Sequence, residues 1–315
     1  MFSEKRVDAP DLSAAQVQSL TRIWQSTIRT LPEASPNWES DLRHVYDLGL
    51  GMQELLTYLY TNKPDLTSFL QWANHHCTIQ AGNDHEDADV FTDRDMVHWH
   101  EQGYIVLKNA VSEEEHTAAN KAVWEFLEAD PAIPESWYQT HPAKNGLMVV
   151  FTQHAALHAI RNSSRIRRAY EQLYGTTAIY KVIDKVSFNP PEHEHYHFAG
   201  SPLHWDTSLE MPIPERLQGL LYLSDVTAEG GAFQCVPGFH RNIREWMDSL
   251  PVGADARRYA LDTLHPVAIP GNAGDFIIWH QALPHCASPN LGKQPRIVQY
   301  LTYIPEHYED HRDWK

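Results

Sequence analysis

Between residues 179 and 304 the chain alternates short apolar runs with turns that contain Pro or Gly, and this alternation limits the fold more than any other feature. Many short strands with turns between them, and no βαβ alternation, favour a sandwich or barrel over a doubly wound sheet. We therefore expect a mainly β (α+β) fold, with a jelly-roll core and helices packed outside it. The strands are expected over 179–188, 217–223, 232–236, 265–269, 275–279 and 296–304.

The first 80 or so residues have a helical pattern instead. Ser13 and Gln16 form a capping box ahead of apolar residues at helical spacing, and this helix is expected to reach Leu31. Further helices are expected over 42–60 and from Asp65 onward. Nothing in this region has the alternation of the later strands.

An acidic stretch at 81–89 breaks the helical pattern and is the best boundary in the sequence. We expect a helical N-terminal extension over residues 1–90 and a single jelly-roll domain over residues 91–315. Inside the second region we expect strands over 104–107 and 147–151 and helices over 112–127 and 163–173.

Composition and charge exclude several classes of protein. The formal net charge is −16, from 25 Lys and Arg against 41 Asp and Glu, so nucleic acid and anionic membrane surfaces are poor partners. The 3 cysteines are scattered and have no CxxC spacing, which fits a reducing compartment. We see no signal peptide or membrane-spanning run and expect a cytoplasmic protein. The sequence leaves monomer and homodimer open.

The segment His204-Trp205-Asp206 carries the first sign of chemistry. On an extended backbone, residues i and i+2 point to the same side, so one imidazole and one carboxylate can face a single ion. His285, after the apolar run at 275–279, can supply a third ligand. Two histidines and one carboxylate with open coordination positions are the ligand set of non-haem Fe(II) oxygenases. The open positions can accept 2-oxoglutarate and O₂.

Arg296, eleven residues after His285, strengthens this interpretation. An HxD motif alone is weak in a chain with 20 histidines and 41 acids. The planar guanidinium of an arginine at this position can bind the distal carboxylate of 2-oxoglutarate through two hydrogen bonds. By itself, Arg296 would more simply be a solvent-exposed residue at the end of a strand.

Several segments, taken in their order along the chain, resemble the phytanoyl-CoA dioxygenase family of 2-oxoglutarate oxygenases. The resemblance covers roughly residues 93–305 and is specific as a set. The matching segments are 101–106, the Pro-rich approach 189–191, the HxD at 204–206, 219–223, 229–232, the PGFHR segment 236–241, 274–276, His280, His285 and Arg296.

The resemblance implies a double-stranded β-helix of the cupin-like type, with Fe(II), 2-oxoglutarate and O₂ as cofactors. It also implies His204, Asp206 and His285 as metal ligands and Arg296 as a 2-oxoglutarate ligand. The chain departs from the family in places. Where many members have Ser two residues after the distal His, it has Ala287, with Ser288 next. We therefore take Ser288 as a candidate for the 2-oxoglutarate contact.

Other polar residues compete for a role near the site. The HxHxH run of His193, His195 and His197 lies in a Pro-flanked stretch. We interpret it as a polar loop near the mouth of the site, and a lid that contacts the substrate is the second interpretation. His280 ends an apolar run and is expected to be structural or to support the site from outside the ligand set. Lys185 stands in an alternating set with Ser187 and Asn189, and either faces the pocket, as a cofactor contact, or faces solvent.

These observations favour an enzyme that hydroxylates an unactivated C–H bond of a small molecule, an amino acid or a natural-product intermediate, with release of succinate and CO₂. Desaturation or ring formation with the same cofactors stays open. Two alternatives from other classes are a metal-dependent cupin-like isomerase or hydrolase and a non-catalytic jelly-roll binding module. Arg296 argues against the first and the intact triad against the second.

Overall fold

The computed structural model describes residues 12–28, 37–77, 88–198, 200 and 202–315. The expected C-terminal end of the first helix at Leu31 and most of the expected boundary at 81–89 lie outside these ranges. The chain forms two compact units, residues 1–82 with 180–184 and residues 83–179 with 185–315. No helix in the described ranges is long and apolar enough to cross a membrane.

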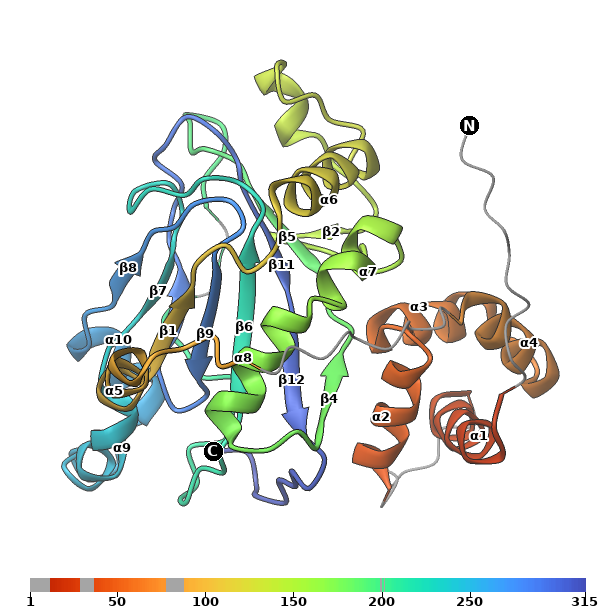
Figure 1. Ribbon diagram of the computed structural model, residues 1–315, viewed down its shortest axis with the longest axis horizontal. Coiled ribbons are helices and arrows are strands. Elements are labelled where there is room, and N and C mark those ends of the chain that lie inside the picture. The colour runs from red at the N-terminus through yellow and green to blue at the C-terminus, as the bar shows by residue number, and fades with distance from the viewer. Residues whose placement is uncertain (1–11, 29–36, 78–87, 199, 201) are drawn as a thin grey trace. The chain divides into compact units, whose positions relative to one another are not determined.

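The first unit is helical (Figure 1). Its apolar faces meet in a core that includes Leu20, Val45 and Phe69. The capping box predicted at Ser13 and Gln16 is present, with both reciprocal hydrogen bonds formed. Its helices are α1 Ala14–Ile28, α2 Trp38–Asp47, α3 Met52–Asn62 and α4 Leu66–His76.

The single helix predicted over 42–60 is wrong, because the chain forms α2 and α3 there. Gly49 has a φ of 75°, in the left-handed region that ends helices and that glycine adopts without steric cost. Gly51 then takes an extended conformation and precedes the first residue of α3.

The second unit is built on a seven-stranded antiparallel sheet in the order β1-β9-β6-β11-β5-β3-β2 and a three-stranded sheet in the order β10-β7-β8. Figure 1 shows the larger sheet with β1, β9, β6 and β11 side by side. The strands of the chain are β1 Tyr104–Leu107, β2 Lys144–Asn145, β3 Met148–Val149, β4 Ile179–Val182, β5 Val186–Asn189, β6 Leu217–Tyr222, β7 Phe233–Cys235, β8 Val267–Ile269, β9 Phe276–His280, β10 His285–Ala287, β11 Arg296–Tyr300 and β12 Thr302–Pro305. Of these, β4 lies mostly in the first unit, which includes residues 180–184.

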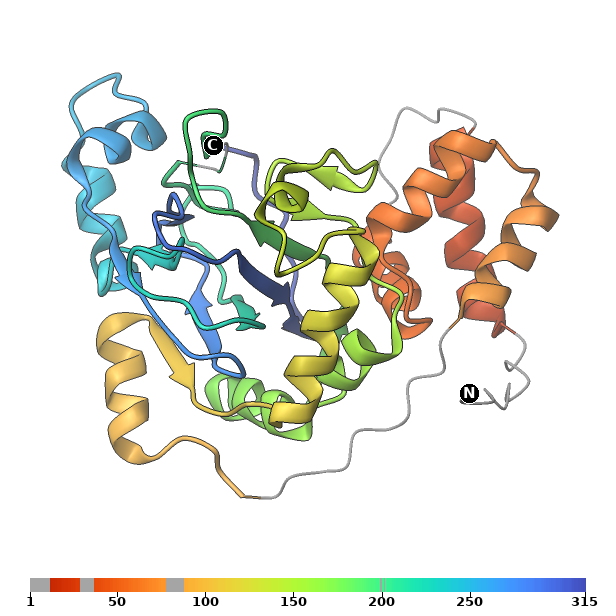
Figure 2. The ribbon, with the colours of Figure 1, turned by 90° about the horizontal axis from the view of Figure 1, so that it is seen from above.

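Helices cover this unit on two sides (Figure 2). The helix predicted after Ser112 begins there with a complete capping box. The basic helix predicted over 163–173 is α8. The helices are α5 Asp93–Gln102, α6 Glu113–Phe126, α7 Ala155–Arg161, α8 Ser164–Tyr174, α9 Phe239–Asp248 and α10 Ala256–Thr263, with a 3-10 turn η1 Pro134–Tyr138.

The two faces of the larger sheet have different neighbours because side chains alternate along each strand. Ile297 of β11 packs in a core shared with Tyr170 of α8 and other residues of α6 to α8. Val298, the next residue, packs on the opposite face with Phe233 of β7. A site between the sheets can therefore be lined only by alternate residues, and on β11 these include Arg296.

Three strand expectations need correction. The run at 179–188 is two strands, β4 and β5, and the run at 296–304 is also two, β11 and β12. The short strand β10 was not predicted. The region expected to be only strands and turns also contains α9 and α10. The HxD and Arg296 nonetheless lie in the predicted jelly-roll unit.

Candidate metal centre

His204, Asp206 and His285 come together at one point of the second unit. His204 lies outside the strands, in an isolated antiparallel bridge. Two main-chain hydrogen bonds pair it with His285, the first residue of β10. These bonds, His204 N to His285 O and His285 N to His204 O, are 3.0 and 2.9 Å long. One ligand atom from each of the three side chains lies within 4.8 Å of the others. Within the described ranges, no other group of three His, Cys, Asp or Glu residues is so placed.

The hydrogen bonds of the two imidazoles determine which nitrogen is free. His204 Nδ1 lies 2.8 Å from the carbonyl of Pro202, and His285 Nδ1 lies 3.1 Å from the carbonyl of Leu283. A carbonyl only accepts, so each Nδ1 donates and each neutral ring keeps its lone pair on Nε2. Both Nε2 atoms face Asp206, as metal-binding nitrogens would.

The Asp206 carboxylate lies between the two rings. Its Oδ1 is 3.4 Å from His204 Nε2, and its Oδ2 is 3.3 Å from His285 Nε2. Burial opposes ionisation, but hydrogen bonds that the two Nε2 atoms donate when the rings are protonated hold the pKa of Asp206 well below its usual range. For His204, burial opposes protonation, but the hydrogen bond and the charge of Asp206, together with the hydrogen bond to the Pro202 carbonyl, outweigh it and raise the pKa. The centre thus attracts positive charge.

This donor set fits a divalent ion. Two imidazole nitrogens and one carboxylate oxygen are the protein ligands of non-haem Fe(II) sites, which keep further positions open. The Asp206 side chain is 50% exposed and that of His204 30%, whereas the His285 side chain is only 7% exposed. The centre is thus buried on the His285 side and open on the Asp206 side, where a second reactant can approach.

Arg296 is a charged residue of the interior. It is 1% exposed, and its guanidinium donates to Gly231 O at 3.1 Å and to Ser187 Oγ at 2.8 Å, both neutral acceptors. Its Nε is buried without a partner, and no ion pair to Arg296 occurs among the described residues. A buried guanidinium without a counter-ion is costly, so this environment favours a bound anion.

The structure brings Ser288 to the same turn as Arg296. Ser288 Oγ donates to Ala232 O at 3.2 Å, next to the Gly231 carbonyl that Arg296 binds. Ser187 and Asn189 are fully buried, so the solvent-facing alternative is wrong for these two. Lys185 is not in this group. It is half-buried and lies just before β5, where its carbonyl accepts a hydrogen bond from Tyr300 N. Arg296 pairs with Asn189, at the opposite end of β5.

The competing histidines lie elsewhere. His193, His195 and His197 are exposed and lie in a loop in which His193 and Tyr196 form a single bridge, as the polar-loop reading predicts. The ring of His280 packs against that of His240, with 5.4 Å between centroids, and is not part of the triad.

The geometry of this centre agrees with a match to a family model. The model for phytanoyl-CoA dioxygenase (PhyH) matches residues 99–298, which is more than half of the chain. The chain belongs to the phytanoyl-CoA dioxygenase family. It is therefore an Fe(II)- and 2-oxoglutarate-dependent oxygenase that uses O₂. This class replaces the isomerase, hydrolase and binding-module alternatives.

Individual relatives support the family and the fold. Methylphosphonate hydroxylase from Gimesia maris is 28% identical over 224 residues, which are 68% of this chain and 81% of that protein. Ectoine dioxygenase from Bordetella bronchiseptica is 22% identical over 242 residues, 69% of this chain and 76% of that protein. The structure of HygX from Streptomyces hygroscopicus with nickel and 2-oxoglutarate bound has a TM-score of 0.51 and 15% identity, covering 71% of this chain and 90% of HygX. The HygX likeness concerns the fold alone.

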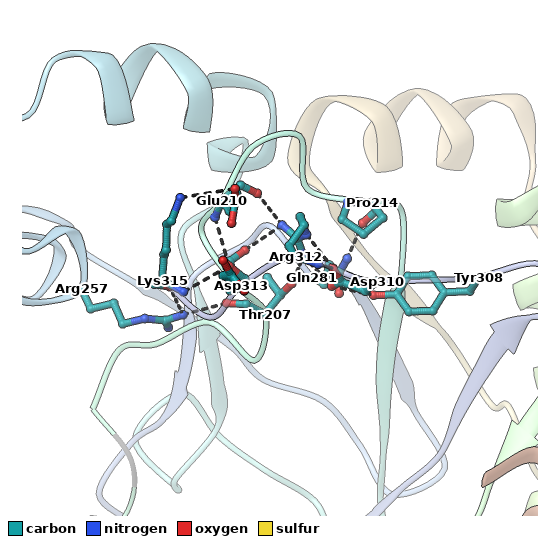
Figure 3. Close-up of polar contacts among 11 residues, drawn as sticks. Thr207, Glu210, Pro214, Arg257, Gln281, Tyr308, Asp310, Arg312, Asp313 and Lys315 are labelled. Carbon is teal, nitrogen blue, oxygen red and sulfur yellow. Dashed lines mark hydrogen bonds and ion pairs between the residues drawn. The ribbon is translucent and has the colours of Figure 1, made fainter. Parts of the chain in front are cut away.

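In this oxygenase the segment after Asp206 is held by the last residues of the chain (Figure 3). Arg312 donates to the carbonyls of Ser208 and Glu210 and to Thr207 Oγ1, while Asp310 pairs with its guanidinium. Thr207 and Ser208 are almost fully buried as a result.

A second arginine holds the same segment from the helical side. Arg257 of α10 donates to the carbonyls of Trp205, Thr207 and Lys315, and its guanidinium lies over the Trp314 ring at 4.7 Å. The sequence carried no signal for these contacts, because 50 or more residues separate the partners. Gln218, which donates to Asp206 Oδ2, was missed for a related reason, since its role requires the strand pairing of β6 with β9.

We expect Arg312→Ala to loosen the segment 207–210, because three acceptors there lose their donor. The free energy of unfolding should fall by roughly 1–3 kcal/mol. Hydrogen exchange measured by mass spectrometry should become faster across 206–211. The exposed Arg258→Ala on α10 serves as the control. Equal protection of this segment in Arg312→Ala and the unaltered chain would contradict the expectation.

His280 generates a pH prediction. Burial, followed by the charge of His240, lowers the pKa of His280 to about 4. An unfolded histidine titrates near 6.5, so between about pH 6.5 and 4 the unfolded chain binds a proton that the folded chain does not. The free energy of unfolding therefore has its full value above pH 6.5. It decreases as the pH falls toward 4, by at most on the order of 3 kcal/mol.

We expect His280→Gln to weaken the fall of the thermal midpoint between pH 6.5 and 4. His311→Gln, at a histidine that is 83% exposed, is the matched control and should leave the slope unchanged. A slope for His280→Gln equal to that of the unaltered chain would show that this imidazole does not cause the acid sensitivity.

Proposed function

We propose that this oxygenase hydroxylates an unactivated C–H bond of a small molecule and binds its iron through His204, Asp206 and His285. The observation that supports this most is the combination of two Nε2 lone pairs and a carboxylate at one point with a buried, counter-ion-free Arg296 in the same unit. The bound iron and 2-oxoglutarate supply the oxidising chemistry with O₂, releasing succinate and CO₂.

Arg296 is proposed to hold the distal carboxylate of 2-oxoglutarate. Its guanidinium is fixed by Gly231 O and Ser187 Oγ and keeps a buried Nε–H without an acceptor. Ser288, which hydrogen-bonds the adjacent carbonyl, is proposed as a second contact to the same co-substrate. Lys185 stands at the opposite end of β5 from this group, and its co-substrate role stays a prediction.

Asp206 bears on the reaction outcome. A carboxylate at this position occupies a coordination place that a halide would need, which supports hydroxylation, desaturation or ring formation over halogenation. Two relatives are named for methylphosphonate and ectoine, both small polar molecules. We accordingly propose a small polar substrate, such as an amino acid or a natural-product intermediate.

We further propose residues 91–315 as the catalytic domain and residues 1–90 as a separate helical extension. The triad, Arg296 and Ser288 all belong to the second compact unit, and none of these groups comes from the first. The second unit also contains the region matched by the family model, apart from residues 180–184.

The triad is tested with Asp206→Ala. We expect loss of Fe(II) binding and of succinate formation from 2-oxoglutarate, because one of three protein ligands is removed. Mass spectrometry with candidate small molecules reads a product gain of 16 mass units for hydroxylation or a loss of 2 for desaturation or ring formation. Asp262→Ala, an exposed aspartate of α10, is the control. Undiminished turnover in Asp206→Ala would exclude this metal site.

Arg296→Met tests the co-substrate site separately. A charge-assisted bidentate contact contributes about 1.5–3 kcal/mol, so 2-oxoglutarate should bind roughly 10–100-fold more weakly. Fe(II) affinity should be retained, because Arg296 is not a ligand. Anaerobic titrations, first with Fe(II) and then with 2-oxoglutarate, measure the two affinities, and Arg258→Met is the exposed control. Unchanged 2-oxoglutarate affinity would remove Arg296 from the co-substrate site.

A further inference from the structure

Gln218 of β6 connects one candidate ligand to a buried indole. Its Nε2 donates to Asp206 Oδ2 at 2.8 Å, and its Oε1 accepts from Trp279 Nε1 at 3.1 Å. We propose that Gln218 is a positioning residue that fixes the Asp206 carboxylate for the metal, and that Trp279 in turn fixes Gln218. The inference rests on the proposed metal role of the triad.

The direction of these hydrogen bonds is determined by the chemistry of the groups. An indole N–H only donates, so the amide oxygen of Gln218 must face Trp279. The amide nitrogen must then face Asp206, which only accepts when ionised. Trp279 therefore excludes the flipped amide, which would place an oxygen against the carboxylate.

The contact with Gln218 differs from the other contacts of Asp206. The imidazoles of His204 and His285 lie 3.3–3.4 Å away, through the Nε2 atoms that would bind the ion. Those contacts are replaced when a cation enters. The hydrogen bond from Gln218 can persist, because Nε2 of an amide is not a metal ligand. It satisfies one carboxylate oxygen and leaves the other for the ion.

Trp279 also contacts the third ligand. Its ring centroid lies 5.2 Å from that of His285 and 4.5 Å from that of Phe233, and the residue is 3% exposed. Gln218 and Trp279 are direct partners in the pairing of β6 with β9, inside the larger sheet. Asp206 itself lies outside any strand. The pair therefore connects an irregular segment to the rigid sheet and to β10.

Gln218→Met tests this, because methionine keeps the chain length and lacks the donor. The purified metal-free chain is titrated with Co²⁺, and binding is followed by calorimetry and by the visible absorption of the bound ion, which depends on ligand arrangement. We expect the Co²⁺ affinity to fall roughly 10–100-fold and the spectrum to change, as for other residues that orient metal ligands. The thermal midpoint of the metal-free chain should stay near that of the unaltered chain.

Trp279→Phe is the second variant and should lower Co²⁺ affinity in the same direction, because the amide loses the donor that orients it. If Gln218→Met does not fold, Trp279→Phe decides alone. The matched control is Gln234→Met on β7, a half-buried glutamine whose Oε1 lies 3.6 Å from Cys286 Sγ, and it should bind Co²⁺ normally.

Two results would overturn the proposal. One is a folded variant whose Co²⁺ affinity and spectrum equal those of the unaltered chain, or whose Co²⁺ affinity is higher. The other is a loss of affinity that is matched by an equal loss of stability without metal, which indicates a merely structural role. Failure of the proposed function has a different signature, since Asp206→Ala would then bind Co²⁺ as tightly as the unaltered chain.

Discussion

The candidate metal centre depends on the pair of main-chain hydrogen bonds between His204 and His285. Residues that exchange both bonds in an antiparallel pair have their side chains held close together, and here the two rings lie 4.6 Å apart between centroids. Their spacing is therefore set by the backbone before any rotamer is chosen. Asp206 then needs only the two-residue period of an extended segment to reach the same point. The last residues of the chain and Arg257 keep that segment in place.

The interior between the sheets combines an apolar core with a small number of polar groups. Val298 and Phe233 belong to the apolar part, whereas Arg296, Ser187 and Asn189 are polar and fully or almost fully buried. The neutral acceptors of Arg296 offset only part of the desolvation of its charge. The folded chain therefore retains an electrostatic preference for an anion at this end of β11, independent of which anion it meets.

Local sequence signals predicted local structure well. The capping boxes at Ser13 and Ser112 are present, and the run at 104–107 coincides with β1. The HxD and His285 converge because a two-residue period and one strand order suffice to bring them together. Signals failed where tertiary contacts decide. In the sequence, Gln218 has the pattern of an ordinary strand residue, and its role depends on the pairing of β6 with β9. Arg312 has the pattern of a solvated residue near the end of the chain, and its role depends on its contacts with the segment after Asp206.

The short strand β10 has a consequence for the kind of co-substrate. It begins with His285, and Ser288 follows its last residue, so about three residues, or roughly 10 Å of extended chain, separate the two. On the proposed roles, one end of this strand holds the metal and the other the co-substrate carboxylate. β10 then fixes the backbone separation between the metal ligand and the co-substrate contact. A 2-oxo acid without a second carboxylate at the matching distance would reach the metal but leave the charge of Arg296 unpaired.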